Sequence, residues 1–284
     1  MEFYLFISAN SLLAATPIDT LLKIDSLMFL KNAKLDNNQS KIVLGMIMVK
    51  QDHSFDSERF KDDFKENSDY TIKDASFENS VITFKVDGNF VAIAQMPVPI
   101  PYGDIETVAA YAYNWNDAAR DLQFHKSHLI VSILGDGKNQ IKSYKILTQV
   151  ISSLLRTTES LGVYMGNQSL LIPKNDYLHE SGLMSEDYLP LNLWIYFGLK
   201  VLGKHKSGYT FGLKEFNKTE MEIIDSSKKI EDIRGFLFNM THYVLDHGVT
   251  FKDGQTCGLS EKERILITLS KGKFVDGDTL KLAY

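Results

Sequence analysis

The chain has 284 residues, of which 44% are hydrophobic, 24% charged and 11% aromatic, and its formal net charge is −5. This composition is typical of a globular protein with a packed core, and it excludes an extensively disordered chain. The acidic balance disfavours nucleic acid as the main ligand, because binding to phosphates needs a clustered basic face.

The single cysteine, Cys257, excludes an internal disulfide and any zinc site built from several cysteines. No apolar run is long enough to span a membrane, so we expect no membrane partner. The first residues, Met1-Glu2-Phe3, lack the basic start of a secretory signal. Together these features favour a cytoplasmic protein.

The N-terminal part of the chain is predicted to alternate between helix and strand. Thr16-Pro17 is typical of a helix start, so residues 1–40 are predicted to form a helical extension. The apolar run at 42–49 predicts a strand buried on both faces. Phe60 and Phe64 follow at helical spacing, which predicts a helix.

Two further strands are predicted at 81–86 and 90–96, joined by a tight turn at 87–89. Three of the six prolines then fall within residues 97–101. Each proline fixes its own φ and has no N–H to donate to a sheet. We therefore expect a stiff crossover that is packed within its own domain.

The next elements continue the alternation. A helix is predicted over 104–122, a buried strand over 128–134, and a long amphipathic helix over 141–161. Gly162 fits the C′ position of that helix, and 163–165 return as a strand.

This order predicts an α+β fold, with mixed β-sheets covered by helices and a ferredoxin-like core as a candidate for the N-terminal half. The domain boundaries follow from composition. We expect an α/β sandwich domain at 41–172, a polar linker at 173–190 that is bracketed by prolines, and a smaller α+β domain at 191–284. An amphipathic helix is predicted at 227–247 in that last domain.

Three short motifs near the C-terminus carry a family resemblance: Tyr209–Leu213, Glu220–Ile223 and Phe251–Leu259. They resemble the bacterial domain-of-unknown-function family 4261. The proline run, Trp115 and His125 resemble the upstream region of its longer members. The resemblance implies an α+β domain and no established activity. Related-looking small domains occur among bacterial toxin-immunity proteins, so an immunity role is an expectation by association.

His125 and His128 are the first candidates for chemistry. Two imidazoles three residues apart can share a metal ion if the turn between them is helical. The alternative is that His125 caps carbonyls at a helix end while His128 begins a strand. We favour the alternative, because a zinc site also needs a third ligand.

Glu220 and Glu222 point to the same face of a predicted strand. With Asp225 or His242 they are candidates for cation binding, acid–base work or contact with a partner. The favoured alternative is an ordinary solvated face, because glutamate is usually exposed.

Trp115 and Tyr113 lie in an aromatic stretch after the prolines and are candidates for a partner-binding surface. The favoured alternative for Trp115 is packing against the proline rod or the sheet. Cys257 is expected to be a small core residue rather than a nucleophile.

No phosphate-cradling glycine loop, zinc motif or nucleophile elbow is present, so we expect no cofactor and assign no catalytic residue. The first hypothesis is a non-catalytic protein-binding protein, in its most specific form an immunity protein that neutralises a bacterial toxin. The second is a hydrolase with a site between the two halves, built from His125, His128, Glu220 or Glu222. The third is a structural or oligomerisation module that pairs through strand edges.

Overall fold

The computed structural model divides the chain into two compact units between Leu178 and His179. This boundary falls inside the predicted linker at 173–190. The predicted helical extension lies outside the described residues. Within the described part of the chain, no helix has both the length and the apolar character needed to cross a membrane. The described residues are 41–50, 55–78, 81–135, 137–260 and 262–284.

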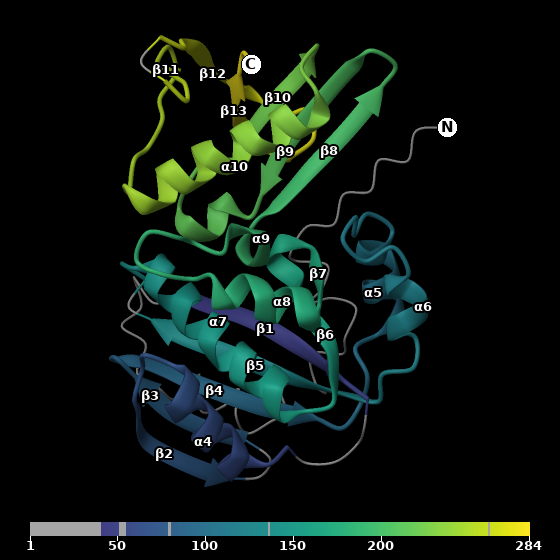
Figure 1. Ribbon diagram of the computed structural model, residues 1–284, viewed down its shortest axis with the longest axis vertical. Helices are drawn as coiled ribbons and strands as arrows, with labels where there is room; N and C mark the ends of the chain where they lie inside the picture. The colour runs from purple at the N-terminus through teal and green to yellow at the C-terminus, as the bar shows by residue number, and fades with distance from the viewer. Residues whose placement is uncertain (1–40, 51–54, 79–80, 136, 261) are drawn as a thin grey trace. The chain divides into compact units, whose positions relative to one another are not determined.

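The first unit is built on a seven-stranded sheet in the order β2-β3-β4-β5-β1-β6-β7 (Figure 1). Every neighbouring pair is antiparallel. The strands are β1 (Lys41–Val49), β2 (Ile72–Glu78), β3 (Val81–Val86), β4 (Asn89–Met96), β5 (Ser127–Gly135), β6 (Ser160–Met165) and β7 (Leu170–Pro173).

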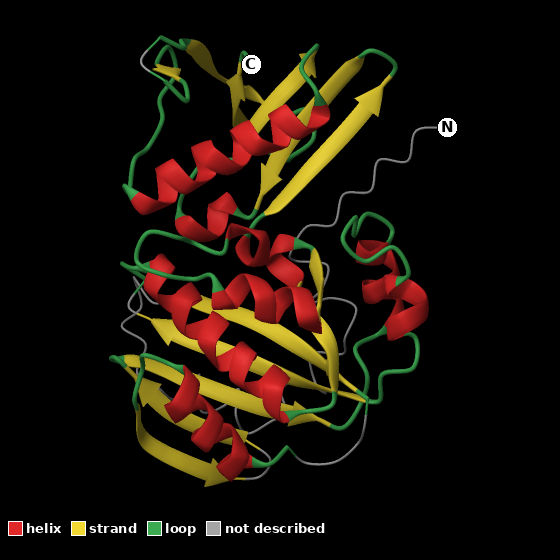
Figure 2. Ribbon diagram, in the orientation of Figure 1, coloured by secondary structure: helices red, strands yellow, loops and turns green. Residues whose placement is uncertain are grey.

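Four of these strands form a ferredoxin-like core. Their order is β4-β5-β1-β6, and β1 and β5 are each followed by a helix, as in a βαββαβ unit. The two helices are α4 (Ser57–Asn67) and α7 (Gln140–Thr157). Figure 2 shows both on one face of the sheet. The predicted helix containing Phe60 and Phe64 is confirmed, and both rings are buried.

Side-chain alternation along β1 separates the two faces of this sheet. A Cβ on Gly45 would lie 2.7 Å from a methyl of Ile151, so this side of β1 faces α7. Met46 and Met48 point to the opposite face, and Ile42 on that face is 40% exposed. The strand is therefore not buried on both faces along its whole length, as the apolar run had predicted.

The predicted turn between β3 and β4 is confirmed. Asp87 and Gly88 both have positive φ, at 47° and 84°, which is the backbone of a two-residue primed turn. By contrast, Gly162 lies within β6 and does not follow a helix end, because α7 already stops at Thr157. The helix was predicted to end too late, at residue 161, because apolar residues continue at similar spacing from α7 into β6.

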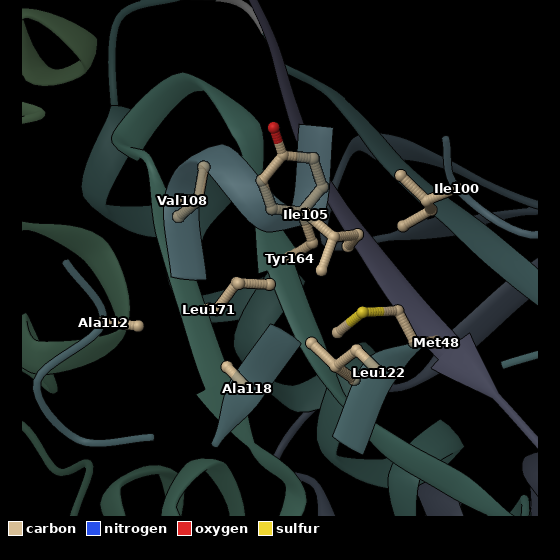
Figure 3. Packing of buried hydrophobic residues seen from close by; sticks show 9 residues of the cluster. All are labelled: Met48, Ile100, Ile105, Val108, Ala112, Ala118, Leu122, Tyr164 and Leu171. Carbon is tan, nitrogen blue, oxygen red and sulfur yellow. The ribbon is translucent and has the colours of Figure 1, made fainter. Parts of the chain in front are cut away.

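The single helix predicted over 104–122 is wrong. The chain forms two short helices, α5 (Tyr102–Ala109) and α6 (Ala118–Leu122), separated by turns. The intervening residues are rich in Asn and Asp, whose side chains compete with helical backbone bonds. The helices cover part of the sheet face opposite α7 (Figure 3). The buried side chains are Met48, Ile100, Ile105, Val108, Ala112, Ala118, Leu122, Tyr164 and Leu171.

The second unit has a six-stranded mixed sheet in the order β11-β12-β13-β10-β9-β8, in which only the β10–β13 pair is parallel. Helix α10 (Ile230–Asp246) packs on β8 and β9 and confirms the predicted amphipathic helix. The strands are β8 (Tyr196–Leu202), β9 (His205–Phe211), β10 (Met221–Ser226), β11 (Thr256–Cys257), β12 (Ile265–Lys271) and β13 (Asp278–Leu282).

The remaining elements are short. Helix α8 (Lys174–Gly182) occupies half of the predicted linker and runs across the boundary between the units. Helix α9 (Leu191–Trp194) precedes β8. Single turns of 3₁₀-helix lie at Gly166–Gln168 and Leu213–Phe216.

Trp115 lies directly over the backbone of β6. A Cβ added to Gly162 would lie 2.7 Å from the Trp115 ring and would also collide with the carbonyl oxygen of Ile172. The indole N–H donates to the Asp121 carboxylate at 2.9 Å. Glycine is therefore required here by the close approach of the ring, and the favoured interpretation of Trp115 as a packing residue is confirmed.

We expect Gly162→Ala to destabilise the protein by about 1–3 kcal/mol, because the indole and the β7 backbone must both move. Urea unfolding and tryptophan emission measure this. Gly103→Ala is the matched control, because a Cβ there meets no atom within 4 Å and alanine favours the helix. Equal stability of the two variants would contradict the packing described for Trp115.

Candidate functional site

Two histidine rings hold the proline run in place. The His125 Nδ1–H donates to the carbonyl oxygen of Leu122 at 2.7 Å, and its Nε2 accepts the N–H of Ile100 at 2.8 Å. The His128 Nδ1–H donates to the carbonyl oxygen of Val98 at 2.7 Å. The backbone between two prolines therefore finds its partners in imidazole groups and not in a neighbouring strand.

This arrangement decides between the two interpretations of the histidines. Both ring nitrogens of His125 are occupied by backbone groups, so His125 has no lone pair left for a metal ion. Its bond to Leu122 caps the end of α6, which is the favoured alternative. Within the described residues, no group of three or more His, Cys, Asp and Glu side chains is placed to hold a metal ion.

Burial favours the neutral form of both rings. It lowers the pKa of His125, against the raising effect of the bond to Leu122. It also lowers the pKa of His128, and the neighbouring His125 adds to that effect. A neutral ring is required at His125, because a protonated Nε2 cannot accept the Ile100 N–H.

The residues held by these rings form an exposed surface, here called the proline–tyrosine segment (residues 97–124). Its prolines, at 97, 99 and 101, are exposed, whereas Ile100 between them is buried. The prediction of a rod packed within its own domain is therefore right for one side of the rod only. Tyr113 is 49% exposed, and Trp115 is half-buried over Gly162.

Glu220 is buried beside the start of β10, which contradicts the expected solvated face. Its carboxylate accepts the hydroxyl of Thr210 at 2.8 Å and the backbone N–H groups of Gly212 and Lys214 at 2.9 and 3.2 Å. Burial outweighs these bonds and raises the pKa of Glu220 to about 7. The side chain has no exposed surface to offer to a partner.

Glu222 is also fully buried, under the loop at 273–275. Its carboxylate accepts the backbone N–H groups of Lys273, Phe274 and Val275 at 2.8–3.2 Å. It also forms an ion pair with Lys281 at 2.9 Å. Burial raises the pKa of Glu222, but these donors outweigh it and the net direction is downward. Like Glu220, Glu222 is a structural anchor with no surface facing a partner.

The other candidates near these carboxylates are engaged elsewhere. Asp225 forms an ion pair with Lys273 at 3.2 Å. The Nε2 of His242 accepts the N–H of Leu189 at 3.4 Å. Cys257 is half-buried, and burial raises the pKa of its thiol to about 11, which opposes a nucleophilic role.

Sequence reasoning missed the partners of these groups. The acceptors and donors around His125 and Glu222 are mostly backbone atoms, at separations of up to 53 residues. A backbone N–H is present on every residue except proline, so the sequence does not show which of them donates to a given side chain. The one available signal was the scarcity of N–H groups in the proline run, which requires donors and acceptors from outside it.

Comparison with known proteins gives one match. Residues 209–283 match the family model described as Domain of unknown function (DUF4261). The match covers the C-terminal quarter of the chain and confirms the resemblance of the motifs there. No curated protein and no solved structure matches the chain.

We expect His125→Ala to lower the free energy of unfolding by about 1–3 kcal/mol at pH 7.5, because it leaves the buried Ile100 N–H unpaired and removes the side-chain bond to the Leu122 carbonyl. The folded pKa of His125 is depressed, so its contribution is complete above the ordinary value of 6.5 and is lost as pH falls below it. The difference between wild type and variant should therefore shrink on acidification.

Urea unfolding between pH 5 and pH 8 measures this difference. His179→Ala, at an exposed histidine, is the control and should give a small difference throughout. A wild-type advantage over His125→Ala that grows below pH 6.5 would show that the neutral ring is not what stabilises the segment.

The two buried glutamates should respond differently to loss of charge. Glu222→Gln at pH 7.5 should cost about 2–4 kcal/mol, because Lys281 and the 273–275 amides lose their anion. Glu220→Gln should cost less than about 1 kcal/mol, because burial already opposes the charged form of Glu220. Thermal unfolding of both variants measures the contrast, and equal losses would contradict it.

Proposed function

We propose that this chain is a non-catalytic protein-binding protein whose partner contacts the proline–tyrosine segment. The observation that carries the proposal is the exposure of five large apolar or aromatic side chains on this one segment. Aromatic side chains contribute most of the binding energy at many interfaces. The exposed fractions are 51% for Val98, 42% for Tyr102, 36% for Tyr111, 49% for Tyr113 and 72% for Phe124.

The segment is also ordered before a partner arrives. His125 and His128 fix its backbone, and Ile100, Ile105 and Leu122 anchor it in the core. A preordered surface loses little conformational entropy on binding, so more of its contact energy remains as affinity. Proline supports this further, because its φ is already fixed.

The hydrolase hypothesis has less support. It requires polar atoms that are available to substrate or water, whereas the donors and acceptors of His125, Glu220 and Glu222 serve backbone groups within their own units. General acid–base catalysis needs a group within hydrogen-bond reach of the reacting proton. Nothing in the described part of the structure favours the hydrolase hypothesis over the binding protein.

The more specific form of the proposal is an immunity protein that neutralises a bacterial toxin. It rests on the resemblance to family 4261 and on the association of related-looking domains with immunity proteins. The expected partner is then a toxin encoded next to this protein's gene. Cells that express that toxin should survive when this chain is co-expressed.

Co-purification with the neighbouring gene product tests the proposal. Tyr113→Asp/Phe124→Asp should reduce the retained partner at least about tenfold, because buried charge opposes docking. Leu259→Asp is the matched control, since Leu259 is 54% exposed in the second unit, and it should retain the partner. Absence of any complex, together with turnover of a small molecule, would overturn the proposal in favour of an enzyme.

A further inference from the structure

The hairpin that joins β8 to β9 carries an exposed apolar tip. Val201 is 63% exposed and Leu202 is 80% exposed. Successive residues of a strand point to opposite faces, so the tip extends beyond the covered part of both faces of the sheet. Phe197, earlier on the same strand, is fully buried and packs against Phe238 of α10. The exposure is therefore confined to the last part of β8.

Basic side chains surround this tip. Lys200 precedes it, and Lys204 and His205 follow it, all exposed. The Nζ of Lys206 donates to the carbonyl oxygen of Lys228 at 3.1 Å, which places the start of α10 beside the hairpin. Lys228 is followed by a further exposed lysine at position 229.

Three acidic residues flank Lys228 and Lys229 in the sequence, namely Asp225, Glu231 and Asp232. Asp225 is already in an ion pair with Lys273 at 3.2 Å. Glu231 and Asp232 lie in the first turn of α10, where they interact favourably with the helix dipole. The surface is thus locally basic on a chain whose formal net charge is −5.

The same hairpin forms a sheet edge. Strand β8 is the last in the order β11-β12-β13-β10-β9-β8, and it pairs with β9 alone among the described strands. An edge strand presents a row of backbone N–H and C=O groups on its outer side. An extended peptide can add to such an edge through main-chain bonds, while its side chains contact those of the edge strand.

The geometry points to the β8 edge and its tip as a docking site for an extended acidic segment of another protein. Main-chain pairing along Leu199–Leu202 supplies the orientation, and the lysines at 200, 204 and 206 supply charge complementarity. This surface lies in the second unit and does not depend on the proline–tyrosine segment.

Charge separates this occupant from a second copy of the chain. Antiparallel pairing of two β8 strands brings the two basic tips into one continuous sheet, where like charges that face each other across strands are destabilising. Lysine on an edge strand is also a common protection against self-pairing. An acidic strand reverses both effects, because each lysine then meets an opposite charge.

A fluorescein-labelled nine-residue peptide of alternating valine and glutamate is a suitable probe, with the valine–lysine peptide as its counterpart. Fluorescence anisotropy on the full chain should give a Kd of about 10–100 µM for the acidic peptide at low salt. Binding should weaken as salt rises, because exposed charges are screened. The lysine peptide should bind at least about tenfold more weakly.

Lys200→Glu/Lys204→Glu should weaken binding of the acidic peptide at least about tenfold. Lys252→Glu/Lys262→Glu is the matched control, with the same change in net charge at exposed lysines elsewhere in the unit, and should bind like wild type. Hydrogen exchange should slow at Leu199–Leu202 when the acidic peptide is added, and Tyr113→Asp/Phe124→Asp should not change it.

Any of four results would overturn the inference. The two peptides bind equally, or the charge-reversed hairpin binds like wild type. Light scattering shows a dimer that Lys200→Glu/Lys204→Glu dissociates, which assigns the edge to a second copy. Vesicles containing phosphatidylserine bind the chain through these lysines while the acidic peptide does not, which assigns the tip to a lipid surface.

Discussion

The first unit depends on how a proline-rich backbone satisfies its hydrogen bonds. The run at 97–101 leaves the sheet after β4 and has few N–H groups of its own, so it cannot form a regular ladder. His125 and His128 provide the missing partners, and they do so from the point where the chain re-enters the sheet as β5. Since His125 must stay neutral to accept the Ile100 N–H, and both rings are buried, the two ends of the proline–tyrosine segment are fixed by one small set of bonds.

The second unit also pairs irregular backbone with buried side chains, but it uses carboxylates where the first unit uses imidazoles. Two buried carboxylates, Glu220 and Glu222, gather backbone N–H groups from turns that lack strand partners. Glu222 is balanced by Lys281, whereas Glu220 has no ion pair within 4 Å among the described residues. In both units, titratable side chains that resemble catalytic candidates in the sequence serve as partners for irregular backbone. The residue types were suggestive of chemistry, but their hydrogen bonds are structural.

Much of the fold was predictable because it depends on local periodicity. The apolar spacing of α7 and α10 and the Asp87-Gly88 turn each follow from a pattern within one segment. The break between α5 and α6 was missed because the apolar spacing outweighed a local signal, the Asn and Asp residues between the two helices. The environment of Glu222 was missed for a different reason: its donors lie about fifty residues away and belong to the backbone. The sequence shows which side chains are present, but the donors to Glu222 are backbone N–H groups, which every residue except proline carries.

The position of the proline–tyrosine segment has a consequence for how the chain can change. In the sheet, Met96 at the end of β4 is the register partner of His128 near the start of β5. The segment therefore leaves and returns at neighbouring points, and closing a loop between such points depends only weakly on loop length. Changes of length in its exposed turns are therefore tolerated better than changes at Ile105 or Leu122, whose side chains are fully buried in the core. The exposed surface can thus diverge between relatives much faster than the ferredoxin-like scaffold that presents it.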